Sequence, residues 1–548
     1  MSLFKRRDFF LKSFIGLLGT GLLLSSKKPS KDNNFVWHGE TDIVVIGAGT
    51  GLVGAITALK KGLKVVVLEK ARSAGGTTAI SGGVAWVPNN HVMKREGFTD
   101  SKSNSLKYLN QLSQGQADQE LIEAFATEGP RMVKFVEDNT SLKWRVSKIM
   151  GEASEYHTDW EGSVLKGRSI EPDTGGPDGA HFGGVLISHL LNTFKNLGGE
   201  MLLDAPATKL ISRENEDGST EVLGVAYSSK GKLYNLKAKK GVHIASGGFD
   251  HDAQMKKNFL SIPSYGVGVK SNTGDGIKMA MKLGADLRNM NEVWGSVVYK
   301  GEAGALGSLN AVTEKKYYAS CILVNRYGNR FANEKADYDS SWRSFHAKEN
   351  WGALKYKNIP AFQIFDHKVR LNGTLGGKTF DQSLPNWFVQ SNTIEGLAKK
   401  LGINQNNLKL TISNFNKNAL SGIDPDFHRG ETHYDRMGLK DTSLALQPLD
   451  QPPFYGAEIA PAHLGTCGGP RVNKFSQVLD VNEIPIKRLC ASGNSSGVGS
   501  PGPSYGGGGG TIGPALTFAY IAGKTLSSFE SWVSVSYTHL TLPTKRIV

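Results

Sequence analysis

The feature that most constrains the fold is a glycine-rich turn at residues 44–54, VVIGAGTGLVG. An apolar run, DIVVIG, leads into the turn, a helical pattern, LVGAITALKKG, leaves it, and a second apolar run, KVVVLEK, follows. This order predicts a βαβ unit with two parallel strands. The G-x-G-x-x-G pattern has a glycine at its sixth position, whereas here Leu52 stands there and Gly51 comes one place early.

The turn and the end of the second strand predict a dinucleotide site. Glycines let the backbone approach a pyrophosphate, and the N–H groups and dipole of a helix N-terminus favour its negative charge. An acidic residue, Glu69, comes twenty-two positions after Gly47, where it can accept hydrogen bonds from the adenosine ribose. An acid there disfavours the 2′-phosphate of NADP, and the alternative, a purely structural β–α turn, does not explain it. The residues assigned to this part of the site are Gly47, Gly49, Thr50, Gly51, Glu69 and Lys70.

A second glycine-rich stretch, GGTTAISGGVAWVPNN, begins at Gly75. Its glycine pairs and small hydroxyl residues suit a chain that passes close to a flat aromatic ring and bonds to the polar edges of the ring. The stretch resembles the motif GG-S/T-S/T-A-x-SGG that lies along FAD in the flavoproteins that include fumarate reductases, succinate dehydrogenases and 3-ketosteroid dehydrogenases. The ketosteroid branch of this family also varies the first glycine turn as this chain does. The resemblance implies FAD contacts from Gly75, Gly76, Thr77, Thr78, Ser81, Gly82 and Gly83.

The resemblance continues to about residue 530 and implies the fold. It implies an α/β protein whose Rossmann-like FAD-binding domain, residues 38–284 and 446–533, is interrupted by an inserted α+β catalytic (capping) domain, residues 285–445. It also implies that FAD is not covalently bound, since the place of the flavin-linked histidine of succinate dehydrogenases falls at about Gly76. Further FAD contacts are implied for Gly247, Gly248, Asp275, Gly493, Asn494, Gly510, Thr511 and Ile512.

The side chains at the flavin face decide the reaction within this family. Fumarate reductases hold two carboxylates with a histidine and arginines, but the matching positions here hold Tyr338, the stretch LGTCGG at residues 464–469, and Tyr505 or its neighbour Gly506. A dicarboxylate without cationic partners in a dry site would lose several kcal/mol. The pattern therefore disfavours fumarate and succinate as substrates.

The tyrosines instead resemble those of the 3-ketosteroid Δ1-dehydrogenases. The resemblance implies catalytic roles for Tyr156, Tyr338, Tyr505 and the Gly509 amide. The Tyr505 O–H and Gly509 N–H would form an oxyanion hole for a ketone, and Tyr338, helped by Tyr156, would take the α-proton while flavin N5 takes a hydride. Any single tyrosine of the 16 in the chain is more often a half-buried structural residue. Because ionising a free tyrosine at pH 7 costs roughly 4 kcal/mol, we expect the site to lower the pKa of Tyr338.

Composition excludes several other classes. The formal net charge is +14, but the lysines are scattered and not interleaved with aromatic residues, so the sequence predicts no nucleic-acid partner and leaves association with an anionic membrane surface as an alternative. The three cysteines, Cys321, Cys467 and Cys490, form no C-x-x-C pattern, so we expect no zinc knuckle, cysteine-ligated cluster or other metal site.

The two ends of the chain are predicted to lie outside the fold. Arg6 and Arg7, followed by FLK at residues 10–12 and about a dozen apolar residues, resemble a twin-arginine export signal, and the apolar run is too short to span a bilayer. Residues 1–37 are therefore predicted to direct export, by the twin-arginine machinery, to the periplasm or the membrane surface; an uncleaved anchor and a disordered arm are the alternatives. Residues 534–548 continue no pattern and are predicted to be non-native or disordered.

Together these features predict an exported FAD-dependent dehydrogenase. It would introduce a double bond next to the ketone of a small hydrophobic substrate, a steroid or another alicyclic ring, and pass electrons to a quinone or other carrier. A reductase of the same fold, fed by a membrane electron donor, is the second hypothesis. A flavoprotein that only relays electrons is the third.

Overall fold

The computed structural model describes residues 35–148, 155–173, 175, 182–350, 354–437, 439 and 442–532. All but the last three residues of the predicted export segment, residues 1–37, lie outside this part of the chain, as does the whole predicted tail, residues 534–548. Within the described residues, no helix is long and apolar enough to cross a membrane.

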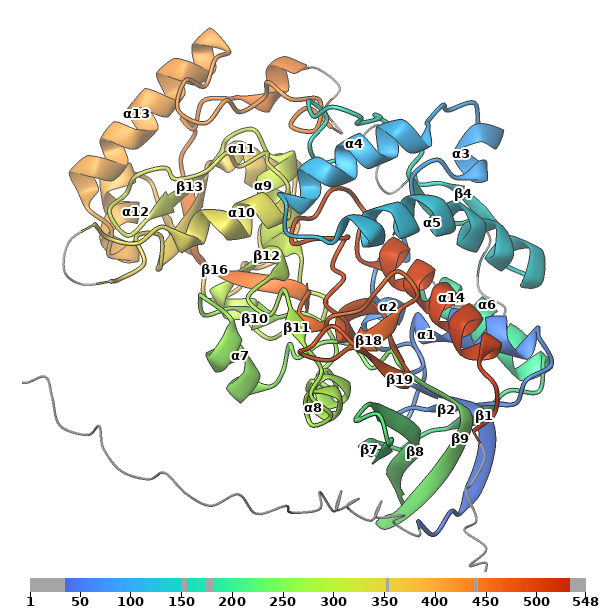
Figure 1. Ribbon diagram of the computed structural model, residues 1–548. Coiled ribbons are helices and arrows are strands. Elements are labelled where there is room, and N and C mark those ends of the chain that lie inside the picture. Colours follow the sequence, from blue (N-terminus) through green and yellow to red (C-terminus); the bar gives the residue numbers. More distant parts are fainter. Residues whose placement is uncertain are drawn as a thin grey trace, which may run out of the picture. The chain divides into compact units, whose positions relative to one another are not determined.

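A large sheet carries the predicted dinucleotide turn (Figure 1). Among the described residues its strands follow the order β18–β19–β8–β9–β1–β2–β6, with β7 paired to β8. The centre is parallel, because β1 pairs in parallel with both β2 and β9, and β7, β8 and β9 form an antiparallel meander. The strands are β1 (Gly39–Ile46), β2 (Val65–Leu68), β6 (Glu200–Leu202), β7 (Ala207–Glu214), β8 (Thr220–Ser229), β9 (Lys232–Ile244), β18 (Gln477–Leu479) and β19 (Pro485–Ala491).

The displaced glycine of the turn has a steric explanation. Helix α1 (Gly51–Leu59) begins at Gly51, where an added Cβ would lie 2.6 Å from the Cβ of Ala245, just beyond β9. The next residue, Leu52, is fully buried in the core under the helix. The chain therefore needs a glycine where α1 starts against the sheet and an apolar side chain one place later, so the departure from the usual pattern does not disturb the turn.

Helices cover the large sheet and bring the C-terminal segment back to it. The last helix packs on α1 so closely that a Cβ on Gly54 would lie 2.6 Å from the backbone oxygen of Ala519, and a Cβ on Gly523 would lie 2.4 Å from that of Gly54. The helices of this part are α1, α2 (Gly76–Ile80), α3 (His91–Arg95), α4 (Lys102–Ser113), α5 (Gln119–Asn139), α6 (Gly183–Asn196), α7 (Ala253–Phe259), α8 (Asp275–Met281) and α14 (Ile512–Ser528).

A second sheet forms the core of the predicted inserted domain, and Figure 1 shows it beside helices α9 to α13. Its central strand β16 pairs with β10, β12, β14 and β15, and β13 pairs with β14. The strands are β10 (Tyr265–Gly266), β12 (Val293–Tyr299), β13 (Cys321–Asn325), β14 (Ala361–Phe365), β15 (Val389–Ser391) and β16 (Phe454–Thr466). The helices are α9 (Asn310–Tyr317), α10 (Tyr338–Arg343), α11 (His367–Asn372), α12 (Ile394–Leu401) and α13 (Gln405–Ser421). The sheet thus takes β10 from before residue 285 and β16 from after residue 445.

Short elements complete the fold. Two small sheets contain β3 (Ala85–Trp86), β4 (Trp144–Val146) and β5 (Ser169–Pro172), and β11 (Leu287–Arg288) with β17 (Gly469–Pro470). The 3-10 helices are η1 (Lys300–Glu302), η2 (Ser344–His346), η3 (Thr442–Ala445) and η4 (Gly493–Ser495). The predicted class, an α/β protein whose Rossmann-like domain is interrupted by an inserted α+β domain, is confirmed.

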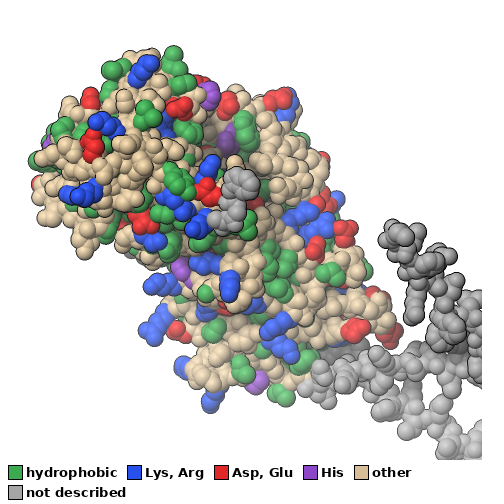
Figure 2. All heavy atoms as spheres, turned by 90° about the vertical axis from the view of Figure 1, so that its left-hand side faces the viewer, with side chains coloured by type: hydrophobic (Ala, Val, Ile, Leu, Met, Phe, Trp, Pro, Cys, Tyr) green, Lys and Arg blue, Asp and Glu red, His purple; other side chains and the backbone are tan. Residues whose placement is uncertain are grey.

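The Lys and Arg side chains do not form one positively charged patch on the face that Figure 2 shows. Lys and Arg side chains are scattered there among Asp and Glu side chains, with hydrophobic groups between them. Interspersed charges of both signs are typical of a solvated protein surface.

Candidate active site

A cavity of about 460 Å³ extends between the glycine-rich turns and the second sheet. Its size falls in the range of about 300–1,000 Å³ for small-molecule and cofactor sites. It is lined by most of the predicted cofactor residues, namely Gly47, Gly49, Thr50, Glu69, Lys70, Gly75, Gly76, Thr77, Thr78, Ser81, Gly82, Gly83, Gly247, Asp275, Gly493, Asn494, Thr511 and Ile512.

Three predicted cofactor residues, Gly51, Gly248 and Gly510, stand behind the wall of the cavity. A Cβ on Gly248 would lie 2.1 Å from Thr466 Oγ1, and one on Gly510 would lie 2.8 Å from the Tyr505 ring. These glycines allow the wall to pack closely, and among the described residues they are not part of the cavity lining.

The nucleotide end of the cavity fits a dinucleotide. Gly47 has a φ of +104°, and a Cβ there would lie 2.3 Å from the Ala245 oxygen, so only glycine is tolerated. Gly76 leaves bare backbone facing open space, because a Cβ there would have no atom within 4 Å, whereas a Cβ on Gly49 would contact the Gly75 oxygen at 3.4 Å. Bare backbone beside the N-terminus of α1 is the arrangement that accommodates a pyrophosphate.

Polar side chains are fixed at the same end. The Glu69 carboxylate accepts hydrogen bonds from Ala48 N at 2.9 Å and Ala71 N at 2.8 Å, which hold it at the cavity wall. The Lys70 Nζ donates to Thr273 Oγ1 at 2.6 Å and forms an ion pair with Asp275 at 2.7 Å. These residues therefore place an acid and a paired cation at the cavity wall, and their contact with a nucleotide stays a prediction.

The opposite end of the cavity holds a cluster of tyrosines. Tyr156 lies with its ring centroid 5.3 Å from that of Tyr338 and 5.4 Å from that of Tyr505, and the latter two rings are 5.3 Å apart. The Tyr156 hydroxyl donates to the Tyr338 hydroxyl at 2.5 Å. A fourth residue, Tyr434, packs against Tyr156, and their ring centroids are 5.0 Å apart. We call these four residues the tyrosine cluster; all four line the cavity.

Backbone pairing places Tyr156 beside the glycine loop that follows Tyr505. Glu155 and Gly507 form an antiparallel bridge, and Tyr156 N donates to Gly506 O at 3.0 Å. Gly509 has a φ of +95°, and a Cβ there would lie 2.6 Å from the Val84 oxygen. The loop is thus held by contacts that require glycine, and it brings Gly509 to the cavity wall with Tyr505.

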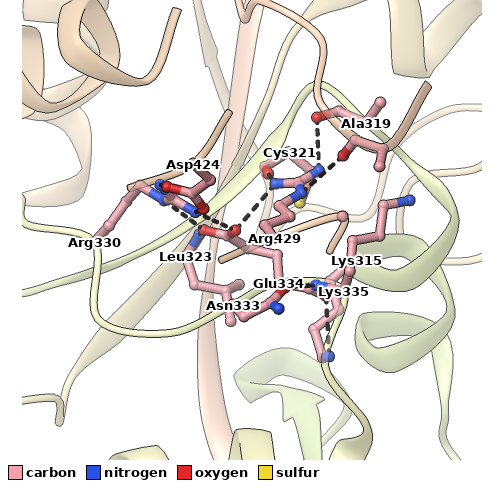
Figure 3. A network of polar contacts seen from close by, with 12 residues as sticks. Lys315, Ala319, Cys321, Leu323, Arg330, Asn333, Glu334, Lys335, Asp424 and Arg429 are labelled. Atoms are coloured by element: carbon pink, nitrogen blue, oxygen red, sulfur yellow. Dashed lines mark hydrogen bonds and ion pairs between the residues drawn. The ribbon is translucent and has the colours of Figure 1, made fainter. Parts of the chain in front are cut away.

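A buried ion network supports the segment that carries Tyr338 (Figure 3). The Glu334 carboxylate bonds to Arg330 at 2.8 Å and to Arg429 at 3.0 Å, and Arg330 bonds to Asp424 at 2.8 Å. Burial alone would raise the pKa of Glu334, but the two arginines hold it at about 2. Tyr338 follows Glu334 by four residues and begins α10, whose N-cap, Asp337, accepts a hydrogen bond from Ser340 N.

The electrostatics of the cluster differ from the expectation. Burial and the neighbouring Tyr505 raise the pKa of Tyr338 well above its ordinary value, and the hydrogen bond from Tyr156 lowers it by less. Burial likewise raises the pKa values of Tyr156, Tyr434 and Tyr505. The expectation that the site lowers the pKa of Tyr338 is therefore wrong, because the packing of distant segments removes the hydroxyl from water.

The cavity also contains residues that the sequence analysis missed. None of the described residues that line it is an arginine, histidine or cysteine, and Arg343 points instead to Asp339, at 2.9 Å, and Glu292. The cavity lining also includes one lysine and several apolar side chains that were not predicted, namely Lys316, Leu309, Val312, Met437 and Leu464. Lys316 stands in the run EKKY, which reads as a solvated helix face, so no signal in the sequence distinguished it.

Comparison with known proteins shows which proteins the chain resembles. A family model described as FAD binding domain matches residues 42–512. The chain is 32% identical over 542 residues to a 4-oxocyclohexanecarboxylate 2-dehydrogenase of Sinomonas cyclohexanicum, covering 89% of this chain and 92% of that protein. It is 33% identical over 559 residues to a 3-oxosteroid 1-dehydrogenase of Mycobacterium tuberculosis, covering 88% and 97%.

The fold agrees with a solved relative. A crystal structure of a 3-ketosteroid Δ1-dehydrogenase from Sterolibacterium denitrificans, in complex with 1,4-androstadiene-3,17-dione, matches with a TM-score of 0.82 and 27% identity, over 89% of this chain and 99% of that one. The chain therefore belongs to the FAD-binding family that contains the 3-oxosteroid 1-dehydrogenases, and it is an FAD-dependent oxidoreductase that acts on CH–CH groups.

Proposed function

We propose that the protein introduces a double bond next to the ketone of an alicyclic ring. The observation that carries this proposal is the tyrosine cluster at one end of a cavity whose other end fits a dinucleotide. Removing a hydride from a saturated carbon is easier when a proton leaves the carbon between it and the ketone, because the ketone then stabilises the developing negative charge. A site for this reaction needs donors for the carbonyl oxygen and a base for the proton.

The described residues can supply both parts. The Tyr505 hydroxyl and the Gly509 N–H converge on the same part of the cavity wall and can donate to the ketone oxygen. Tyr338 accepts the α-proton, and Tyr156 stabilises its ionised form by the hydrogen bond that it donates at 2.5 Å. FAD, held by the glycine turns and by Glu69, supplies the acceptor for the hydride.

The substrate is a ring ketone. The related enzymes from Mycobacterium tuberculosis and Sinomonas cyclohexanicum are named for a 3-oxosteroid and for 4-oxocyclohexanecarboxylate, and both of these carry a ketone on a six-membered ring. Leu309, Val312, Met437 and Leu464 offer such a ring an apolar surface beside the cluster. The lack of arginine and histidine among the described lining residues argues against a fumarate reductase-like reaction, which binds two carboxylates.

Three further features belong to the proposal. FAD is bound without a covalent link, and what supports this part of the proposal is that Gly76 stands at about the place of the flavin-linked histidine of succinate dehydrogenases. Arg6 and Arg7 direct export by the twin-arginine route, so the protein works in the periplasm or at the membrane surface. There the electrons pass to a quinone or another carrier.

Anaerobic titration of the purified holoenzyme tests the function. Addition of a 3-ketosteroid or of 4-oxocyclohexanecarboxylate should bleach the flavin absorbance, and succinate should not. The proposal fails if no ring ketone bleaches the flavin while an enone or acrylate reoxidises flavin reduced with dithionite, because the protein would then be the reductase of the second hypothesis. Bleaching by neither class and reoxidation by neither would leave only an electron-relay role.

A further inference from the structure

Lys316 is a cation at the tyrosine end of the cavity. The residue lies in α9, is 5% exposed, and lines the cavity. Its Nζ stands 3.7 Å from the centroid of the Tyr434 ring and donates to the backbone oxygens of Lys335, at 2.8 Å, and of Tyr434. An ammonium group has three N–H donors, so these two carbonyls leave one donor for a further partner.

Carboxylates act on the charge of Lys316 only from beyond ion-pair distance, and they belong to Asp435 and Asp337. In the part of the chain that the structure describes, no ion pair includes this residue, although Lys70 at the other end of the cavity is paired with Asp275. A buried cation without an anionic partner is destabilising. A carboxylate that bound in the cavity would therefore give Lys316 the direct ion pair that it lacks among the described residues.

The surroundings of Lys316 indicate that an anion would bind favourably there. Burial lowers the pKa of Lys316 well below its ordinary value; Lys315 and Lys335 lower it further, and Asp435 and Asp337 oppose them. A carboxylate that entered the cavity would favour the charged ammonium and accept its remaining N–H. The Lys316 ammonium would thus gain a hydrogen-bond acceptor and a counterion from the same carboxylate.

We propose that Lys316 binds a carboxylate carried on the same ring as the ketone, and that a keto acid of a single alicyclic ring is the preferred substrate. The proposal rests on the function proposed above. Lys316 and Tyr156 both lie against Tyr434, whose ring centroid is 3.7 Å from the Lys316 Nζ and 5.0 Å from the Tyr156 ring centroid, so only a short distance separates the ammonium from the catalytic tyrosines. That separation suits a ketone and a carboxylate on opposite sides of a six-membered ring, whereas the side chain of a steroid lies several rings from its 3-ketone. Val312 and Met437 offer apolar surface to the ring between the two polar ends.

Steady-state kinetics with matched substrates test the proposal. 4-Oxocyclohexanecarboxylate and its neutral carboxamide have the same ring and ketone, so the ratio of their kcat/KM values isolates the carboxylate. The wild-type protein should favour the acid, and Lys316→Met should reduce that ratio about 10- to 100-fold, the range expected for a hydrogen bond to a charged group. The loss should appear mainly in KM, and Lys316→Arg should restore most of the preference.

Two controls separate a binding role from a structural one. Lys315→Met removes a neighbouring buried ammonium, which donates to the backbone oxygens of Glu334 and Ala336 and does not line the cavity. Because Lys315 lowers the pKa of Lys316, its loss favours the charged Lys316, so the acid-to-amide ratio should stay at the wild-type value or rise even if kcat falls. Competitive inhibition by cyclohexanecarboxylate, which cannot react, should weaken in Lys316→Met by the same factor. If Lys316→Met does not fold, the wild-type ratio and the inhibition decide the matter.

The outcomes distinguish this inference from the proposed function. Equal kcat/KM values for the acid and the amide in the wild-type protein, or efficient turnover of a neutral 3-ketosteroid alone, would overturn the role of Lys316 and leave the dehydrogenase intact. Failure of every ring ketone to reduce the flavin would overturn the dehydrogenase itself.

Discussion

Replacing Tyr338 by phenylalanine separates the role of its hydroxyl from that of its ring. The ring would keep its packing against Tyr156 and Tyr505, with centroids 5.3 Å from each. The hydroxyl that accepts the Tyr156 hydrogen bond would be lost. We expect the variant to fold, to bind FAD and to lose turnover.

Tyr338→Phe should lower both kcat and folding stability by amounts that can be estimated. A positioned general base contributes about 10²- to 10⁴-fold to the rate, so kcat should fall by that factor, which corresponds to about 3–5 kcal/mol in the barrier. The buried Tyr156 hydroxyl would lose its acceptor, which costs about 1–3 kcal/mol of folding stability. FAD content should stay at the wild-type level, since the glycine turns and Glu69 lie at the other end of the cavity.

The assay combines turnover of a ring ketone, with an artificial electron acceptor, and the flavin absorbance of the purified protein. Tyr299→Phe is the matched control: Tyr299 is fully buried in the second domain, its hydroxyl donates to Glu314, and it does not line the cavity. That control should lose stability and keep turnover. A Tyr338→Phe protein that holds FAD and retains kcat within tenfold of the wild type would refute the assignment of Tyr338 as the base.

Three more predictions follow from the geometry. Burial raises the pKa of Tyr338 above its ordinary value of about 10, so the ionised fraction of Tyr338 is still growing between pH 7 and 9. We therefore expect kcat/KM to rise through pH 7–9, and a plateau in that range would contradict a tyrosine base. Gly47→Ala should abolish FAD binding, measured by flavin absorbance, whereas Gly62→Ala, also at positive φ but with nothing within 4 Å, should keep it. Burial raises the pKa of Glu155 from 4.5 to about 8, although the positive charge of Arg168 opposes the rise. Folding stability should therefore fall as pH rises from 4.5 to 8, by about 3 kcal/mol at pH 7. In thermal melts, Glu155→Gln should flatten that decline.

Local patterns predicted the parts of the fold that depend on neighbouring residues. The first strand, helix and strand follow from the apolar runs on either side of the glycine turn, and Gly47 and Glu69 meet because the unit is short. The second sheet depends on strands far apart in the chain, and the pairing of β10 with β16 joins segments on both sides of the insertion. No periodicity within either segment indicates that pairing, so the sheet extends beyond the range predicted for the inserted domain.

Site residues that belong to sequence motifs could be predicted, and those that depend on tertiary contacts could not. Tyr156, Tyr338 and Tyr505 were found through family motifs, and the structure brings them together. Tyr434 and Lys316 were missed, because their positions matter only through tertiary contacts: the Lys316 ammonium donates to backbone oxygens from two other segments. The raised pKa of Tyr338 was missed for a related reason, since the desolvation that causes it comes from residues distant in sequence.

Analysis of the reaction product shows whether the protein forms a double bond beside the ketone. The holoenzyme is incubated with a saturated ring ketone and an electron acceptor, and the products are identified by mass spectrometry and NMR. We expect a product that has lost two hydrogens and carries a double bond conjugated with the ketone, and we expect Tyr338→Phe to form little of it. Recovery of the ketone unchanged, with an enone reduced when the flavin is supplied with electrons, would contradict the account.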